Sequence, residues 1–279
     1  MRWAYRPQNL KKEQTLITRL KNRISIITGA GQGIGRAAAR RFALEGAVVV
    51  IADVSQEAAH RTRDELRQSG ARSEIYLGDL MRWEGAQGLI DFTLQTFGHI
   101  DILVNNVGGA TALRPFHLWD PAEIVEEMHR SILPTIYCSR AALPSMIERN
   151  FGRIVNVGAE SARNGLWDRA PYNAGKGAVM ALTTSIAREY AAAGVICNCF
   201  SPGPTDTQPD RIVERGIRAK LGNETEYFRE MTRRTLAIVP MGRQASTDEQ
   251  AAGIAFLASD DVGHITGQVL SAGGGMNML

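Results

Sequence analysis

Cysteine, aromatic residues and long apolar runs are all scarce in this chain of 279 residues, which has 3 cysteines and 6% aromatic residues. The odd set of Cys138, Cys197 and Cys199 shows no pairing pattern, which argues against a disulfide scaffold and favours core thiols in a reducing compartment. No segment reaches the ~18 consecutive apolar residues of a membrane helix, and the basic N-terminal residues lack the apolar core of a secretory signal. We therefore expect a cytoplasmic protein with no membrane partner.

The balance of charge argues against a further class of function. Lys and Arg number 32 against 29 Asp and Glu, and the net charge of +3 is too small to favour a nucleic-acid partner. The 5 histidines are scattered, and none forms a close pair at the spacing of metal ligands. We expect neither nucleic acid nor a catalytic metal.

Short apolar segments alternate with helical patterns along the chain. Strands are expected at residues 24–28, 47–52, 73–77, 100–105, 153–157, 195–201 and 267–271. Helices are expected at residues 35–45, 55–69, 83–97, 121–149, 172–193, 208–235 and 247–257, with kinks or breaks at Pro134 and Pro144. This alternation predicts an α/β fold, a Rossmann-type doubly wound parallel sheet of about seven strands with helices on both faces. Residues 23–279 would form a single domain, and residues 1–22 an N-terminal arm outside it.

A glycine-rich turn, TGAGQGIG at residues 28–35, separates the first expected strand from the first helix. Such a turn lets the backbone approach a pyrophosphate, and the helix offers free N–H groups and the positive end of its dipole. Asp53 closes the second strand, where a carboxylate accepts both hydroxyls of an adenosine ribose and repels a 2′-phosphate. Gln32 adds no positive charge for such a phosphate, so the sequence predicts NAD in preference to NADP. The alternative is that Asp53 is a solvated residue at a strand end.

Tyr172 and Lys176 stand four residues apart and share one face of an expected helix. A free tyrosine, with a pKa of about 10, is a poor base at neutral pH. A nearby ammonium stabilises the phenolate and lowers that pKa, so this spacing can make a tyrosine a proton acceptor. By itself, such a pair is more often ordinary surface chemistry.

Five motifs in a fixed order give these residues their context. They are the turn at 28–35, Gly78-Asp79-Leu80, Asn105-Asn106-Val107-Gly108, Tyr172-x-x-x-Lys176 and the segment SPGPTDT at 201–207. Together they resemble the short-chain dehydrogenase/reductase family over about residues 23 to 275. The resemblance implies an enzyme whose residues 204–240 vary with the substrate, and a homotetramer or homodimer.

The resemblance also implies roles for single residues. Tyr172 would remove the proton of a substrate hydroxyl while hydride passes to the nicotinamide. Lys176 would hold the nicotinamide ribose and lower the pKa of the tyrosine. The residues implied to bind NAD, besides Tyr172 and Lys176, are Gly29, Gln32, Gly33, Ile34, Gly35, Asp53, Val54, Asp79, Leu80, Asn106, Val107, Gly108, Pro202, Gly203, Thr205 and Thr207.

Two catalytic positions depart from the family pattern. Ala159 stands where the family has the serine that orients the substrate oxygen, and it has no hydroxyl. We expect Ser161 to take this role after a rearrangement of the loop at 159–170; the alternative is that no serine acts or that the enzyme is impaired. Ser131 replaces the asparagine that opens the long helix, and its hydroxyl can bond locally to the backbone.

The departures point to a subgroup. The stretches NNVGG at 105–109, RSILPT at 130–135 and GAES at 158–161 are similar to bacterial dehydrogenases that oxidise cis-dihydrodiols of arene carboxylates to catechols, in aromatic catabolism. Gly109, Arg163 and Trp167 are candidate substrate contacts. Arg114 and Arg169 are further candidates for binding a carboxylate, although loop arginines are more often solvated or ion-paired.

Other functions stay open at this point. The chain could reduce a ketone or a 3-oxoacyl thioester, although Asp53 disfavours NADPH. It could oxidise a polyol, a sugar or a hydroxysteroid. It could also bind NAD without catalysis, which Ala159 and Ser131 would suit and the intact Tyr172 and Lys176 oppose.

Overall fold

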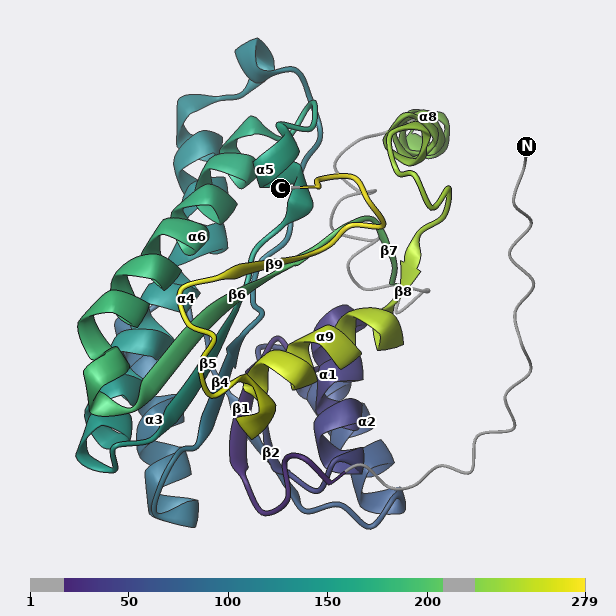
Figure 1. Ribbon diagram of the computed structural model, residues 1–279. Helices are drawn as coiled ribbons and strands as arrows, with labels where there is room; N and C mark the ends of the chain where they lie inside the picture. Colours follow the sequence, from purple (N-terminus) through teal and green to yellow (C-terminus); the bar gives the residue numbers. More distant parts are fainter. Residues whose placement is uncertain (1–17, 208–223, 279) are drawn as a thin grey trace.

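Seven parallel strands form the centre of the protein, seen in a computed structural model that describes residues 18–207 and 224–278 (Figure 1). They run in the order β3-β2-β1-β4-β5-β6-β9. Their bounds are β1 Ile24–Thr28, β2 Val48–Asp53, β3 Ser73–Leu77, β4 Ile102–Asn105, β5 Gly152–Val157, β6 Val195–Pro202 and β9 Val269–Ala272. The predicted doubly wound sheet is confirmed.

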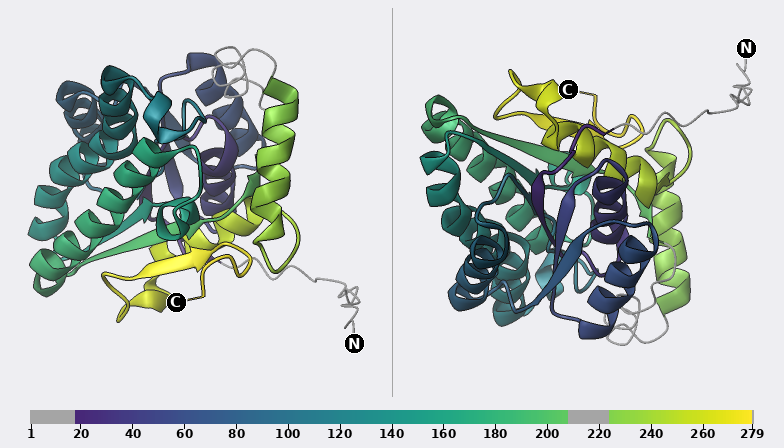
Figure 2. Two further views of the ribbon diagram at one scale, coloured as in Figure 1. Left: turned by 90° about the horizontal axis from the view of Figure 1, so that it is seen from above. Right: turned by 90° about the horizontal axis from the view of Figure 1, so that it is seen from below.

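Helices cover both faces of this sheet (Figure 2). On one face lie α1 (Gly33–Leu44), α2 (Gln56–Gln68) and α9 (Thr247–Ala258), and on the other α3 (Trp83–Phe97), α4 (Pro121–Glu148) and α6 (Ala170–Tyr190). Each layer has its own apolar core, with Phe42 and Ile254 buried in the first and Leu103 and Met146 in the second. The central strands β1, β2 and β4 are mostly apolar because both of their faces are buried, whereas the edge strands β3 and β9 are partly exposed.

The long helix α4 is continuous over 28 residues, so neither Pro134 nor Pro144 breaks it, and the kink that is the other expectation stays a prediction. A proline inside a helix removes one backbone hydrogen bond, and packing can outweigh that loss. Here Cys138 and Ala142 on the same helix are fully buried, and Pro134 is buried as well. The start of α4 is fixed by a capping box. The side chain of Asp120 accepts the backbone N–H of Glu123, and the side chain of Glu123 accepts the backbone N–H of Asp120.

The segment before β1 belongs partly to the fold. Leu20, placed by sequence in the N-terminal arm, is 0% exposed within the core layer that contains Phe42. Its N–H donates to the carbonyl of Glu45 at 3.1 Å, and Arg19 pairs with the Glu45 carboxylate at 2.9 Å. The fold therefore begins before residue 23, and residues 1–17 of the predicted arm lie outside the described residues.

Smaller elements lie at both ends of the strands. They are η1 (Phe116–Leu118), α5 (Glu160–Asn164), η2 (Ala191–Ala193), β7 (Thr205–Asp206), α8 (Glu224–Ala237), β8 (Ala245–Ser246) and η3 (Asp260–Val262). Strands β7 and β8 pair with each other outside the main sheet. Of the helix expected at 208–235, residues 224–235 are helical and residues 208–223 lie outside the described part of the chain.

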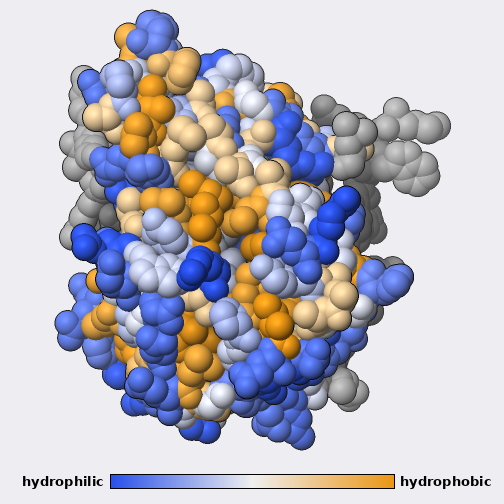
Figure 3. Space-filling view, turned by 90° about the vertical axis from the view of Figure 1, so that its left-hand side faces the viewer, coloured by the Kyte–Doolittle hydropathy of each residue, from blue (hydrophilic) through white to orange (hydrophobic). Residues whose placement is uncertain are grey.

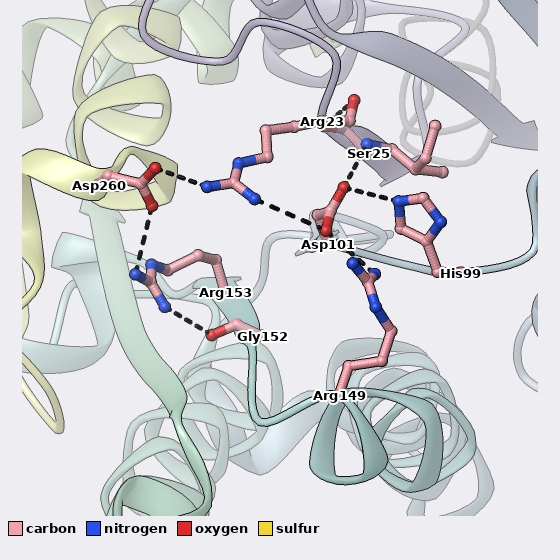
Figure 4. Close-up of polar contacts among 9 residues, drawn as sticks. Arg23, Ser25, His99, Asp101, Arg149, Gly152, Arg153 and Asp260 are labelled. Atoms are coloured by element: carbon pink, nitrogen blue, oxygen red, sulfur yellow. Dashed lines mark hydrogen bonds and ion pairs between the residues drawn. The ribbon is translucent and has the colours of Figure 1, made fainter.

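A cluster of charged side chains lies at the amino ends of the strands (Figure 4). The buried carboxylate of Asp101 accepts the N–H of Ile24 at 2.9 Å, and His99 and Arg149 each lie 3.2 Å from it. Asp260 binds Arg23 at 2.6 Å and Arg153 at 3.3 Å. The cluster thus connects the beginnings of β1, β4 and β5 with η3.

All three cysteines are buried free thiols, as expected for core residues. Within residues 18–207 and 224–278, no helix combines the length and the apolar character needed to cross a membrane. The same part of the chain brings no three potential metal-ligating side chains together.

Candidate active site

The strand order changes direction between β1 and β4, and ligands of doubly wound sheets bind at the carboxyl ends of strands at such a point. Asn106 bridges these two strand ends. Its N–H donates to the hydroxyl of Thr28 at 2.8 Å, and its side-chain amide donates to the Thr28 carbonyl at 2.9 Å. The expected asparagine motif therefore holds the loop after β4 against the glycine-rich turn.

The turn before α1 fits a pyrophosphate. Gln32 is the N-cap residue in an extended conformation, and no side chain caps the helix or places an acid in its first turn. The N–H groups of that turn are thus left for an anion. Gly35 lies so close to the turn that a Cβ there would overlap the carbonyl of Gly29. Ile34 packs against the apolar core beneath the turn.

Asp53 is the last residue of β2, the position at which the sequence predicts a carboxylate that binds the adenosine ribose. Its two oxygens accept the N–H of Gly31 at 2.8 Å and the N–H of Ser55 at 2.9 Å. The carboxylate is therefore aimed at the glycine-rich turn and held there by backbone donors. Its position and its charge fit an adenosine ribose without a 2′-phosphate.

The segment after β6 reaches the same turn from the other side. The methyl group of Thr207 would lie 3.7 Å from a Cβ at Gly33, although the two residues are far apart in sequence. Thr205 is held beneath it, because its hydroxyl donates to the carbonyl of Gly203 at 2.9 Å and lies 3.2 Å from the amide of Gln250. Pro202, the last residue of β6, is partly buried.

Four other predicted cofactor residues differ in their surroundings. Val54 is exposed beside Asp53, and Asp79 is exposed and accepts the N–H of Met81 at 3.0 Å. The Leu80 side chain is buried in the core, so only its backbone could serve a cofactor. Val107 lies against the turn, with its methyl group 3.4 Å from a Cβ at Gly29.

Lys176 is buried beside the loop after β4. Its ammonium donates to the carbonyl of Val157 at 2.7 Å and would lie 2.9 Å from a Cβ at Gly108. Burial lowers the pKa of Lys176 to about 8, and the neighbouring Cys199 opposes this. Lysine, the end of β5 and the loop at Gly108 therefore meet at one place.

Tyr172 lies in the first turn of α6, one turn before Lys176. Burial raises the pKa of Tyr172 to about 12, Arg169 lowers it and Glu127 raises it. The positive charge that lowers the pKa of the Tyr172 phenol in the described part of the chain is thus that of Arg169. The lowering by Lys176 that the resemblance implies stays a prediction.

Ser131 of α4 packs against Gly175, the residue before Lys176 on α6. A Cβ at Gly175 would lie 2.5 Å from the Cβ of Ser131, whose buried hydroxyl has no hydrogen-bond partner among the described residues. Pro134 has no N–H for the carbonyl of Arg130, and that carbonyl lies 4.0 Å from the Cβ position of Gly108. A carbonyl that lacks its usual helix donor therefore lies near Gly108, which Lys176 also approaches, and a hydroxyl without a partner among the described residues lies against Gly175.

Ala159 is the N-cap residue of α5, and Ser161 lies in the first turn of this helix with 7% of its surface exposed. Between them, Glu160 is fully buried and accepts hydrogen bonds from Ser271 at 2.8 Å and Asn277 at 2.6 Å. Arg163, a predicted substrate contact, pairs with this carboxylate at 3.2 Å. Arg163 is thus paired within α5 itself, while Glu160 joins this helix to the C-terminal segment.

The other predicted substrate contacts lie in two loops. Gly109 follows Gly108 in the loop after β4, and a Cβ there would meet nothing within 4 Å. Trp167 is 41% exposed, and Arg234 of α8 stacks over its ring at 4.4 Å. Arg114 pairs with Glu123 at 2.9 Å, whereas Arg169 lies 3.4 Å from the carbonyl of Trp167 and is the arginine whose charge lowers the pKa of Tyr172.

Two buried acids, Glu127 and Glu160, were not identified from the sequence. Glu127 is 1% exposed and shares the buried face of α4 with Ser131 and Thr135. The spacing of four residues along one helix face was the available signal. Glu160 gave no such signal, since Ser271 and Asn277, which donate to it, lie more than a hundred residues away.

Comparison with known proteins decides the family. The profile of the short chain dehydrogenase family matches residues 23–216. The chain belongs to this family. A 1,6-dihydroxycyclohexa-2,4-diene-1-carboxylate dehydrogenase from Acinetobacter baylyi is 39% identical over 257 residues, which cover 92% of this chain and 97% of that protein.

Two further short-chain dehydrogenase relatives extend the comparison. A 2,3-dihydroxy-2,3-dihydro-p-cumate dehydrogenase from Pseudomonas putida is 36% identical over 261 residues, 93% of this chain and 96% of that protein. The crystal structure of an NAD+-bound xylitol dehydrogenase has a TM-score of 0.83 at 29% identity, covering 91% of this chain and 99% of that one. The family resemblance, the enzyme class and the similarity to dehydrogenases of arene-carboxylate dihydrodiols are confirmed.

Proposed function

We propose that this short-chain dehydrogenase uses NAD to oxidise a cis-dihydrodiol that carries a carboxylate on its ring, giving a catechol. The observation that carries the chemistry is the meeting of Lys176, the end of β5 and the loop at Gly108 one turn beyond Tyr172. The substrate class is supported by relatives 36% and 39% identical to this chain, whose names specify dihydroxylated ring carboxylates.

Different residues of the chain would bind the cofactor, accept the proton and orient the substrate. NAD, when bound, supplies the hydride acceptor. The turn before α1 would hold its pyrophosphate and Asp53 its adenosine ribose. Tyr172 accepts the proton of the reacting hydroxyl at its phenol oxygen, and Ser161 is proposed to orient that hydroxyl. Lys176 binds the nicotinamide ribose and, with Arg169, favours the phenolate.

Arg169 is also the proposed partner of the substrate carboxylate. It lies three residues before Tyr172 at the N-cap of α6, and its charge lowers the pKa of the phenol. A guanidinium binds a carboxylate in a bidentate manner, which would place the ring of the substrate beside the tyrosine. A neutral diol would lack this contact.

Incubation with NAD and a panel of alcohols tests the proposal. We expect NADH absorbance to appear with cis-dihydrodiols of benzoate and p-cumate, and to appear much more slowly with the same diols lacking a carboxylate. The structural similarity to a xylitol dehydrogenase makes a polyol the second candidate. Faster oxidation of xylitol than of any dihydrodiol would contradict the first proposal, and NAD binding without any oxidation would indicate a silent NAD-binding protein.

Asp53→Asn should reverse much of the preference for NAD. The amide still accepts one backbone N–H but no longer repels a 2′-phosphate, and it loses a charge-assisted hydrogen bond to the ribose. We expect the ratio of kcat/KM for NAD to that for NADP to fall at least about tenfold. The neighbouring Glu57→Gln, an exposed change in the first turn of α2, is the control and should leave the ratio unchanged. An unaltered ratio in Asp53→Asn would show that the ribose is bound elsewhere.

We also propose that the protein is a cytoplasmic homotetramer or homodimer. The three free thiols suit a reducing compartment. On the outer face of α4 and α6, apolar side chains are grouped in the middle of the view in Figure 3. Ala178 and Ala181 are exposed there, whereas Ile186 and Ala187, which the sequence could not distinguish from them, are buried in the core.

A further inference from the structure

Glu127 is a carboxyl group in a place where an apolar residue is expected. It is 1% exposed on the face of α4 that also carries Ser131, Thr135 and Cys138, each of which is buried. An ionised group in such surroundings is costly unless donors satisfy it. Burial raises the pKa of Glu127, and hydrogen bonds from Thr111 oppose that shift, as does the charge of Arg130.

The donors come from the loop after β4. The N–H of Thr111 lies 3.2 Å and 3.1 Å from the two carboxylate oxygens of Glu127, and the Thr111 hydroxyl donates to the second of these oxygens. The same loop is held at Asn106 by the end of β1 and passes Lys176 at Gly108. Glu127 therefore holds the far end of the segment that borders the active site.

Glu127 also lies beside the part of α6 that carries the phenol. One turn further along α4, Ser131 packs against Gly175, which is in the turn after Tyr172. The charge of Glu127 acts on Tyr172 in the opposite sense to that of Arg169. The remaining charged groups that act on Glu127 are Arg130 and Glu126, which pair with each other at 2.8 Å on the exposed side of α4.

We propose that Glu127 is a positioning residue of this site. Its buried carboxylate fastens the loop 106–111 to α4 through Thr111 and places a negative charge within range of Tyr172, opposite in sign to Arg169. This rests on the proposed function, in which Tyr172 is the proton acceptor. The loop that borders the substrate and the acidity of the phenol are then controlled by one side chain.

Stability and function should respond to Glu127 in different ways. A carboxyl whose pKa is raised by folding stabilises the fold at low pH and loses that contribution as the pH rises through the raised value. The ionised carboxylate is thus a cost to stability at neutral pH. A residue whose role is only structural would not be expected to carry that cost.

Two substitutions separate the two roles. Glu127→Gln keeps an acceptor for the N–H of Thr111 and removes the charge, so the acid-side midpoint of the kcat/KM profile should move to lower pH by roughly half a unit to one unit. Its melting temperature at pH 8 should equal or exceed that of the wild type. Glu127→Ala also removes the acceptor, so hydrogen exchange at the Thr111 amide should become at least about tenfold faster.

Glu148→Gln is the matched control, because it removes the same charge from the exposed end of the same helix, remote from Thr111 and Tyr172. It should change neither the pH profile nor exchange at Thr111. An unshifted profile in Glu127→Gln, a lower melting temperature in that variant, or unchanged exchange in Glu127→Ala would each overturn the proposal. If the wild type oxidises no diol, the proposed function fails, whereas the exchange and melting measurements still decide the role of Glu127.

Discussion

Tyr172→Phe should lower kcat by about 10²- to 10⁴-fold, the usual contribution of a positioned acid or base, while the affinity for NAD stays within a few-fold of that of the wild type. The substitution removes the phenol oxygen that accepts the substrate proton and leaves the ring in place. Turnover with the preferred diol and fluorescence titration with NADH measure the two quantities. The residual activity should also lose the rise with pH that the wild type owes to ionisation of the phenol.

Tyr190→Phe provides the control on the same helix. Tyr190 ends α6, roughly 27 Å along the axis from Tyr172 at 1.5 Å per residue, and packs against the core. It should keep wild-type kcat. If Tyr172→Phe retained full turnover, the proton would have to leave by another group and the proposed mechanism would be wrong.

Glu160→Ala should produce the largest loss of stability among these variants. The fully buried carboxylate binds Ser271, Asn277 and Arg163, so its removal takes one buried acceptor from two donors and an ion-pair partner from a largely covered guanidinium. Breaking a buried pair in this way costs about 3–5 kcal/mol. At about 2–4 °C per kcal/mol for a chain of this size, the melting temperature should fall by roughly 6–20 °C.

Two further variants identify the cause of that loss. Glu160→Gln keeps hydrogen-bond acceptors and loses the charge, so its melting temperature should lie between those of Glu160→Ala and the wild type. Glu148→Ala removes an exposed acid at the end of α4 and should change stability by no more than about 0.5 kcal/mol. A melting temperature for Glu160→Ala equal to that of the wild type would mean that the C-terminal segment is held by other contacts.

Local signals were sufficient for the sheet and its helices. Strands such as β1 and β2 are short apolar runs between turns. Parallel strands that are buried on both faces commonly have this pattern, so the sequence alone predicts them. Local signals failed at α4, where two prolines suggested breaks. The helix continues because packing of buried residues such as Cys138 outweighs one missing hydrogen bond. They failed again at Leu20, whose burial depends on its contact with the end of α1.

The same distinction applies to the candidate site. The glycine-rich turn, Asp53 and the pair Tyr172 and Lys176 are spacings within one segment, and the sequence reveals them directly. The bond of Lys176 to the Val157 carbonyl and that of Glu127 to Thr111 depend on how separate elements pack. The sequence alone does not show that the carboxylate of Glu127 binds the loop that contains Thr111.

The charge cluster of Asp101 and Asp260 has a consequence for how such a protein can diversify. Because it ties the beginnings of β1, β4 and β5 together, the alignment of the central strands is secured at the rim remote from the catalytic groups. Loops at the catalytic rim can then change their length and side chains without loosening the frame. New substrate preferences can therefore arise by altering the loops at the carboxyl ends of the strands while the opposite ends preserve the architecture.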